Sequence, residues 1–374
     1  MYFIKYVVVL LVILLIHYRY VNNDRKHLYW NKEQPVVFEY NNKEGLIINQ
    51  KDAVYYDKPS NTTLIYFNNE TMLNFVDFIN KYFEQDVIYT NEYILWLMNN
   101  SINNNLLFGL KVKNKLCAVM GGNDIFINID NKSYGCVYVD FLAVDKDYRN
   151  NNYTLELIAV ISKYMINNSR EISIFKSDKK QLPFKYLFKT NYYQCNINKY
   201  VNYIKLHNKL FNKDQKNYIN LKKISHDNIE TYGKSIYEIY LKKRYDYRLT
   251  EILDYNIFIK RIINKTLVFY DINTSYIYGF ITYNILKYKD RDNLSCDIYY
   301  FELDDCVSET TQKIINMFVT YLNDDNIYDI VITYNDHTKT LIKNLIVNKS
   351  NTCYYYLYNY NLNNITINNV LLDF

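Results

Sequence analysis

The chain has 374 residues, enough to bury two modest hydrophobic cores, and a formal net charge of only +5. This mild basicity gives no reason to expect a nucleic-acid partner. The six cysteines are scattered without a CxxC pair, and none of the five histidines stands in a metal-ligand spacing. A disulfide framework and a zinc site are therefore not expected, and we predict no metal. Tyrosine is abundant while glycine and proline are scarce, which is typical of AT-rich coding rather than of a mechanism.

The first predicted element is a membrane anchor at residues 2–20. An uninterrupted apolar run extends from Val7 to Ile16 with aromatic residues on both sides, and a span needs about 20 residues. No small-residue cleavage site follows, so we expect a retained anchor rather than a removed signal peptide. Only Lys5 precedes the run, whereas several basic residues follow it, which places the body of the protein in the cytoplasm.

The segment that follows is predicted to form one helix and two β-hairpins. Apolar residues recur at helical spacing from Met72 to Phe83. The alternating runs 108–112 and 116–120 flank a polar turn, and the runs 124–129 and 136–144 flank another. We therefore expect antiparallel strands over this region.

The stretch from Tyr138 to Lys176 carries the clearest pattern. Tyr138–Val144 is rich in β-branched and aromatic residues and predicts a buried central strand. A basic, Asn-rich loop follows, helical spacing begins at Tyr153, and Glu171–Lys176 returns as a strand. Free backbone N–H groups and the helix dipole would make this loop a phosphate site. An ordinary polar loop in a βαβ unit is the alternative interpretation.

The second half of the chain repeats this order of elements. Helical spacing occurs at 229–240 and 314–322, and strand patterns occur at 267–270, 277–281, 298–303 and 327–332. We therefore predict an α/β (α+β) fold with two similar halves, residues 21–205 and 206–374, divided near the polar segment 205–218.

Five stretches resemble, in order, the motifs of one enzyme family. They are Tyr29–Val36, Tyr82–Trp96, Asp140–Arg149, Tyr192–Asn198 and Tyr355–Tyr360. Each motif alone is weak, but together they cover roughly residues 28–374. On these motifs the chain resembles the N-myristoyltransferases, which join two GNAT-like acyltransferase units around one continuous twisted β-sheet.

The resemblance implies transfer of a myristoyl group from myristoyl-CoA to the N-terminal glycine of peptides or proteins. It implies no permanently bound cofactor, an acyl-CoA site in the first half and a peptide site in the second. The expected partners are myristoyl-CoA, N-terminal-glycine peptides and, through the N-terminal helix, a membrane. We expect a monomer.

The resemblance also assigns residues. The oxyanion donors would be the backbone N–H groups of Phe141 and Leu142, and the base would be the α-carboxylate of Phe374, with Asp373 or Asp140 as possible substitutes. The residues expected to bind acyl-CoA are Tyr29, Trp30, Leu142, Ala143, Val144, Lys146, Arg149, Asn150, Asn151, Asn152, Tyr153 and Thr154. The residues expected to bind the peptide are Tyr82, Glu84, Asp86, Asp140, Ser177 and Tyr192.

The sequence departs from the family at two of these places. The family's Ser-Lys-Arg after Arg149 is replaced by three asparagines, and the family's Asn before Phe-Leu is Asp140. An N-myristoyltransferase is the first interpretation. A pseudoenzyme that binds acyl-CoA or a peptide without turnover and a membrane protein that uses the fold only as a scaffold remain alternatives.

Overall fold

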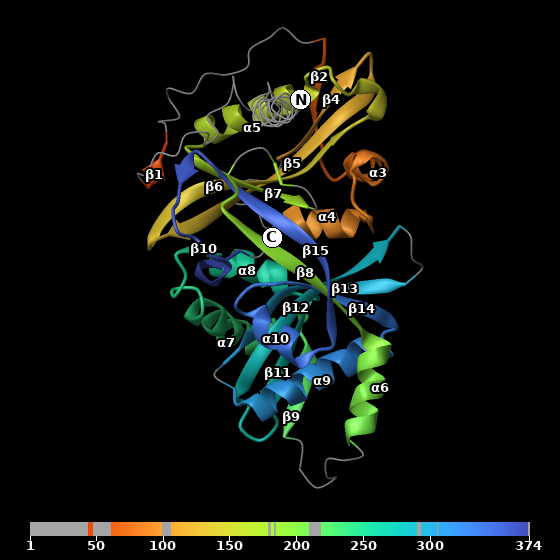
Figure 1. Cartoon of the computed structure of the whole chain (residues 1–374), viewed down its shortest axis with the longest axis vertical. Helices are drawn as coiled ribbons and strands as arrows, with labels where there is room; N and C mark the ends of the chain where they lie inside the picture. The colour runs from red at the N-terminus through yellow and green to blue at the C-terminus, as the bar shows by residue number, and fades with distance from the viewer. Residues whose placement is uncertain are drawn as a thin grey trace, which may run out of the picture.

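The computed structural model describes residues 44–47, 61–98, 106–178, 181–182, 185–208, 218–289, 293–304 and 306–372. One mixed 15-stranded sheet runs through them, with helices on both faces (Figure 1). Its main path has the order β17-β10-β5-β6-β7-β15-β8-β14-β13-β12-β11-β9, and β2, β3 and β4 pair off this path. The protein therefore has the α+β architecture that the sequence predicts.

The first half supplies the following elements: β1 (Gly45–Leu46), β2 (Thr63–Tyr66), α3 (Met72–Tyr82), β3 (Val87–Ile88), α4 (Asn91–Met98), β4 (Leu106–Val112), β5 (Lys115–Ile129), β6 (Lys132–Val144), the short 3₁₀ helix η2 (Lys146–Tyr148), α5 (Tyr153–Asn167), β7 (Ile172–Asp178), β8 (Phe188–Asn196) and α6 (Ile197–Asn208). Strands β6 and β7 are parallel and are joined through α5. The predicted βαβ unit is confirmed.

One prediction here was wrong. The runs 116–120 and 124–129 were expected as separate strands, but they form the single strand β5. The residues between them, including Gly121 and Gly122, keep pairing with β6 on one side, and a local register shift near Val119 bends the strand without ending it.

The second half supplies β9 (Ile219–Lys223), α7 (Ile229–Lys242), β10 (Leu249–Glu251), α8 (Tyr255–Ile262), β11 (Thr266–Asp271), β12 (Ile277–Tyr288), β13 (Leu294–Leu303), α9 (Ser308–Asp324), β14 (Ile327–Thr333), α10 (Thr338–Asn344), β15 (Val347–Tyr358), β16 (Tyr360–Asn361), η3 (Ile367–Asn369) and β17 (Val370–Leu371). Strands β13 and β14 are parallel and flank α9, just as β6 and β7 flank α5.

Two layers of helices bury the sheet in each half. In α5 the apolar residues Leu157, Ile161 and Met165 recur every four residues and pack on strands β4 to β6. Helices α3 and α4 bury the opposite side of β6, where Phe75 contacts Phe141. In the second half, α9 with α6 covers one side and α7 with α8 the other. The polar cavity described below lies between the two halves.

The last long strand completes the centre of the sheet. Strand β15 lies between β7 and β8 and is antiparallel to both (Figure 1). Strand β8 pairs in turn with β14 of the second half. The C-terminal segment therefore holds the two halves together.

No helix within the described residues is long and apolar enough to cross a membrane. The predicted anchor at residues 2–20 lies outside them.

Candidate functional site

The site begins with a bulge in strand β6. Phe141 and Leu142 together stand opposite one residue of β5, because the pairing passes from Asp140 with Gly121 to Ala143 with Val119. Phe141 has a φ of 55°, a left-handed conformation that bulky residues rarely adopt. The bulge re-aims the backbone at this point of the strand.

Strands β6 and β7 also separate here. Their parallel pairing ends at Val139 and Phe175, although β6 continues to Val144 and β7 to Asp178. The opening between them leads into two cavities.

The first cavity, which we call the apolar cavity, has a volume of about 410 Å³. Helix α5, the outer part of β6 and β7 supply most of its lining, and most of those side chains are hydrophobic. They include Val139, Ala143, Ile158, Ile161, Met165 and Phe175, and Met120 of β5 adds to the lining. Arg149 also lines it. Such a cavity suits a hydrocarbon chain attached to an anionic group.

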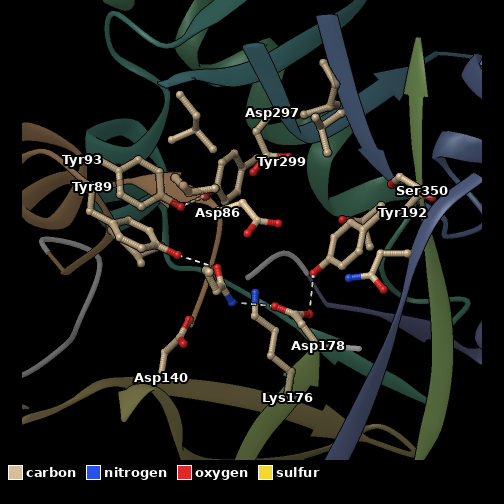
Figure 2. A pocket seen from close by; sticks show the side chains of 18 of the residues that line it. Asp86, Tyr89, Tyr93, Asp140, Lys176, Asp178, Tyr192, Asp297, Tyr299 and Ser350 are labelled. Atoms are coloured by element: carbon tan, nitrogen blue, oxygen red, sulfur yellow. Dashed lines mark hydrogen bonds between the residues drawn. The ribbon is translucent and has the colours of Figure 1, made fainter. Parts of the chain in front are cut away.

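The second cavity, which we call the polar cavity, has a volume of about 470 Å³ and is lined by both halves of the protein. Figure 2 shows carboxylates, phenols and one lysine pointing into it. The labelled members are Asp86, Tyr89, Tyr93, Asp140, Lys176, Asp178, Tyr192, Asp297, Tyr299 and Ser350.

The two cavities meet at the bulge. The residues that line both are Glu84, Gln85, Asp140, Phe141, Lys176 and Asp178. A molecule in one cavity could therefore react with a molecule in the other beside the backbone of Asp140 and Phe141.

Asp140 is a hydrogen-bonded carboxylate at this meeting point. Its Oδ1 accepts from the Phe141 N–H at 2.7 Å, and its Oδ2 accepts from the Tyr138 hydroxyl at 3.1 Å. Burial raises the pKa of Asp140, while the charge of Lys176 and the Phe141 hydrogen bond act in the opposite direction. The site thus holds a carboxylate whose charge depends on its neighbours.

Asp178 stands across the junction from Asp140. It accepts from Gln85 Nε2 at 2.6 Å and from the Tyr192 hydroxyl at 3.3 Å. The Tyr89 hydroxyl donates to Gln85 Oε1 at 2.6 Å. These bonds tie the segment between α3 and α4 to strand β7 and to the wall of the polar cavity.

The same segment is tied to the apolar cavity. The Tyr82 hydroxyl donates to Asp145 Oδ2 at 2.9 Å, and Glu84 Oε1 pairs with Arg149 Nη2 at 3.0 Å. Both partners of the Arg149 pair are substantially exposed, so the pair itself is weak. An anionic ligand could displace Glu84 from Arg149 at small cost.

The second half contributes an acid and two phenols. Burial raises the pKa of Asp297 to about 7, which leaves this carboxyl partly protonated at neutral pH. The Tyr93 and Tyr299 hydroxyls lie 2.6 Å apart, and one donates to the other. Both belong to the polar cavity.

The loop before α5 fits an anion by its backbone. Asn150 and Asn152 have positive φ values of 68° and 62°, a conformation that asparagine tolerates better than most residues. No side chain of the described residues caps the start of α5, and uncapped N–H groups at a helix start favour an anion.

Among the described residues no group of three or more histidine, cysteine, aspartate or glutamate side chains could hold a metal ion.

Comparison with known proteins identifies this arrangement. Residues 64–184 match the family model described as "Myristoyl-CoA:protein N-myristoyltransferase, N-terminal domain". A protein of Amsacta moorei entomopoxvirus, provisionally named a glycylpeptide N-tetradecanoyltransferase, is 27% identical over 228 residues, which are 59% of this chain and 69% of that protein. The chain belongs to the N-myristoyltransferase family. It is therefore an acyltransferase by family.

Solved structures of the family share the fold. Saccharomyces cerevisiae N-myristoyltransferase with bound myristoyl-CoA superposes with a TM-score of 0.74 at 17% identity, covering 91% of this chain and 94% of that chain. A second yeast structure, with bound myristoyl-CoA and inhibitors, gives 0.73 at 17% identity and covers 91% of each chain. The large mixed sheet is thus the sheet of this family.

The structure gathers part of the predicted acyl-CoA site. Leu142, Ala143, Val144 and Arg149 line the apolar cavity. Lys146 is exposed on the short helix η2. The predicted residues Asn150, Asn151, Asn152, Tyr153 and Thr154 lie at the start of α5 and are not among the cavity's lining residues. The carboxylate that pairs with Arg149 is Glu84 of the segment between α3 and α4.

The predicted peptide site divides between the cavities. Asp86 and Tyr192 line the polar cavity, Tyr82 and Ser177 line the apolar cavity, and Glu84 and Asp140 line both. Tyr82 and Ser177 therefore lie on the opposite side of the bulge from the other predicted peptide contacts.

One of the predicted oxyanion donors is already hydrogen-bonded within the protein. The Phe141 N–H, expected as an oxyanion donor, is already bonded to Asp140. Tyr29, Trp30, Asp373 and Phe374 lie outside the described residues. Leu372, the last described residue, lines the polar cavity.

Lys176, Asp178 and Asp297 line the polar cavity but are not among the predicted site residues. A signal was present, because each is a charged residue within an otherwise apolar strand pattern. Lys176 and Asp178 are also two residues apart, which places both side chains on the same face of β7.

Proposed function

We propose that this protein transfers a myristoyl group from myristoyl-CoA to the N-terminal glycine of peptides or proteins. One observation carries the proposal: an apolar cavity and a polar cavity meet at the bulge of Asp140 and Phe141. A hydrophobic acyl donor and a charged amine acceptor need such a pair of sites with a common boundary.

The acyl donor would enter the apolar cavity. Its chain would lie among the hydrophobic side chains of α5, β6 and β7, and its phosphates near Arg149 and the start of α5. The thioester carbonyl would then stand at the bulge. Backbone N–H donors at an oxyanion are worth about 3–4 kcal/mol each in comparable acyl transfers.

The acceptor would enter the polar cavity as an ammonium and lose a proton to a base. Its amine nitrogen would then attack the thioester carbon, so that a C–N bond forms and the C–S bond breaks. The leaving thiolate takes up a proton, and the nitrogen releases its second proton as the amide forms. The acidic lining of the polar cavity suits the initial ammonium.

We assign the base to the α-carboxylate of Phe374. Leu372, the last described residue, lines the polar cavity, which supports this assignment. Asp373 and Asp140 are the alternative bases. None of the five histidines stands in a catalytic motif.

A binding protein without turnover is the second candidate. It is favoured by the bond between Asp140 Oδ1 and the Phe141 N–H, which occupies a donor that the oxyanion would need. In an active enzyme the thioester oxygen or the acceptor ammonium must draw Asp140 away.

A single assay separates these candidates. The full chain is incubated with myristoyl-CoA and a library of Gly-initial peptides, and products are read by mass spectrometry. We expect myristoyl amides on the glycine nitrogen. Tight donor binding in a calorimeter without any acylated peptide would support the binding protein, and no donor binding would reject both.

We also propose that residues 2–20 anchor the protein in a membrane with its body facing the cytoplasm, where acyl-CoA is available. The run Val7–Ile16 and the basic residues after it support this orientation. Protection of the C-terminus from protease in sealed vesicles whose cytoplasmic face is outside would contradict it.

The division of labour between the halves is a further part of the proposal. The apolar cavity is built mainly from residues of the first half, whereas the polar cavity draws on β13 and β14 of the second half as well. We therefore assign the acyl-CoA site to residues 21–205. We assign the peptide site to residues 206–374, completed by first-half residues of the polar cavity such as Asp86 and Tyr192. We expect a monomer in solution.

A further inference from the structure

Lys176 has no role in the proposal so far, yet it occupies the centre of the site. It is the one lysine among the described residues that line either cavity, and it lines both. Figure 2 shows its side chain extending from β7 into the polar cavity between Asp140 and Asp178. A buried ammonium at a reacting centre is costly unless neighbouring groups stabilise it.

Charged and titratable groups surround this ammonium from several elements. Strands β6 and β7 contribute Tyr138, Asp140 and Asp178, with Nζ 6.0 Å from the centre of the Tyr138 ring. Strands β8 and β15 contribute Tyr192 and Tyr355, and Cys353 lies behind them. Burial lowers the pKa of the Lys176 ammonium, whereas the negative charge of Asp140 raises it.

More groups face Lys176 from the other half and from the segment around α4. They are Asp297, Tyr299, Tyr89 and Tyr93, all of which interact electrostatically with it. Glu84 and Asp86 add negative charge to the cavity lining. Burial raises the pKa values of these phenols and keeps them neutral, so only the carboxyl groups can balance the charge of Lys176.

No carboxylate of the described residues holds Lys176 in an ion pair within 4.0 Å, although Asp140 and Asp178 flank it. Each of these carboxylates is instead bonded to neutral donors, Asp140 to Tyr138 and the Phe141 N–H, and Asp178 to Gln85 and Tyr192. The arrangement leaves a space with one cation and two fixed carboxylates. The amine of an acceptor bound between these carboxylates would therefore lie beside the Lys176 ammonium.

We propose that Lys176 is a catalytic residue that acts directly on the acceptor amine: its ammonium lies beside the bound amine and, by charge repulsion, favours the neutral nucleophile over the protonated form. Asp140 and Asp178 offset the repulsion enough for the acceptor to bind. Lys176 thus sets the lowest pH at which acyl transfer proceeds. The inference rests on the proposed function and concerns the same site.

The test is the pH dependence of single-turnover acyl transfer at saturating Gly-initial peptide, which reports ionisation in the bound complex. In the full chain, Lys176→Met should move the rising limb of the profile upward by about one pH unit, which lowers the rate near neutral pH about tenfold. The peptide KM should stay constant or fall, because a repulsive charge has been removed. Lys176→Arg should keep the limb in place.

Asp140→Asn supplies the opposite change. Loss of a negative charge should move the rising limb of the pH–rate profile to lower pH. The double variant Lys176→Met/Asp140→Asn should return the limb close to its original position. Lys205→Met, at an exposed lysine of α6, is the matched control and should leave the profile unchanged.

A second readout keeps the inference testable if Lys176→Met is unstable. A peptide with ¹⁵N-glycine, bound with a non-transferable thioether analogue of the acyl donor, is titrated by NMR in the natural protein and in Lys176→Arg and Asp140→Asn. We expect the bound amine to titrate below the free peptide in the natural protein.

An unmoved limb in Lys176→Met, or a bound amine that titrates above the free peptide, would overturn the role of Lys176 while leaving acyl transfer intact. Absence of any acylated peptide with the natural protein would instead reject the proposed function.

Discussion

Strands β6 and β7 of the first half and strands β13 and β14 of the second half form the same backbone arrangement with different contents. In both pairs the parallel pairing stops while the strands continue, after Val139 in β6 and after Ile298 in β13. In both, a bulge follows at once, at Phe141 and Leu142 in the first half and at Tyr299 in the second. In each half the two parallel strands therefore separate beyond the bulge. We call the separation of β6 from β7 the first opening and that of β13 from β14 the second opening.

Side chains decide what each opening holds. Beyond the first bulge lies the apolar cavity. Beyond the second, Glu302 of β13 is buried with Arg244 Nη1 at 2.9 Å and His337 Nδ1 at 2.5 Å. Arg261, which bonds the Tyr300 hydroxyl and Glu251, fills the space nearby. Buried ion pairs therefore occupy the second opening, whereas the first opening contains a cavity that could hold a ligand.

The loops that follow the strands differ in charge. After β6 the chain carries Lys146 and Arg149 before α5, whereas after β13 Asp304 pairs with Lys242 and Glu309 lies in the first turn of α9. Carboxylates near a helix start would repel a phosphate that basic residues attract. The loop after β6 therefore carries the charge that the proposed phosphate contact needs, whereas the loop after β13 does not.

The largest expected effect is a loss of peptide acylation when the chain is extended at its C-terminus, which tests the polar cavity. Appending several residues after Phe374 should abolish peptide acylation, because the α-carboxylate would no longer reach the acceptor. Binding of myristoyl-CoA should remain, as measured by calorimetry. The same residues added before Met1 serve as a control. A C-terminally extended protein with normal kcat would reject the assigned base.

The second opening should respond in stability rather than in kinetics. Glu302→Ala leaves the buried Arg244 without the carboxylate it pairs with and should destabilise the protein by about 3–5 kcal/mol. Urea unfolding measures this loss. At a temperature where the variant is folded, its KM for myristoyl-CoA should be normal, and a selective rise in that KM would contradict the comparison.

The first opening should respond in kinetics rather than in stability. Arg149→Ala should raise the KM for myristoyl-CoA about tenfold, equivalent to about 1–2 kcal/mol for one charge-assisted contact. The urea midpoint should hardly move, because the Arg149–Glu84 pair is exposed. Lys163→Ala, on the same helix as the cavity lining but outside both cavities, provides a charge-matched control. An unchanged KM would assign Arg149 to the surface pair alone.

The smallest effect is a pH dependence of the second opening. Burial raises the pKa of Glu302, but His337 and Arg244 outweigh burial and hold it below its ordinary value. The resulting stabilisation is present above the unfolded pKa near ~4.3 and is lost as pH falls through the lower folded value. The difference in urea midpoint between the natural protein and Glu302→Gln should therefore narrow between pH 6 and pH 3. A constant difference would show that Glu302 charge adds nothing.

Local pattern was enough to predict the elements around the bulge. The strand at Tyr138–Val144, the helix from Tyr153 and the returning strand all depend on nearby residues, and all three are present. The motif after Asp140 also located the boundary between the cavities. These features are encoded within about forty residues.

The composition of the polar cavity could not be predicted in the same way. Lys176 and Asp297 meet only because β15 joins β7 to β8 and β8 joins β14, pairings between segments far apart in sequence. The pairing of Arg149 with Glu84 likewise depends on how α3 packs against β6. Charge in a strand signals a site, but its partners follow from the long-range topology.

The position of β15 has a consequence for how the protein is made. This strand is made long after β7 and β8, yet it fills the middle of the sheet between them. Until it is in place, β7 and β8 each have one exposed edge, although β8 can already pair with β14 and β5 with β10. Completion of the fold must therefore await nearly the whole chain, and sheets that depend on such distant pairings form slowly. A prematurely ended chain would lose the central strand together with the residues that follow it. Nascent fragments would then be targets for chaperones or proteases rather than partly active transferases.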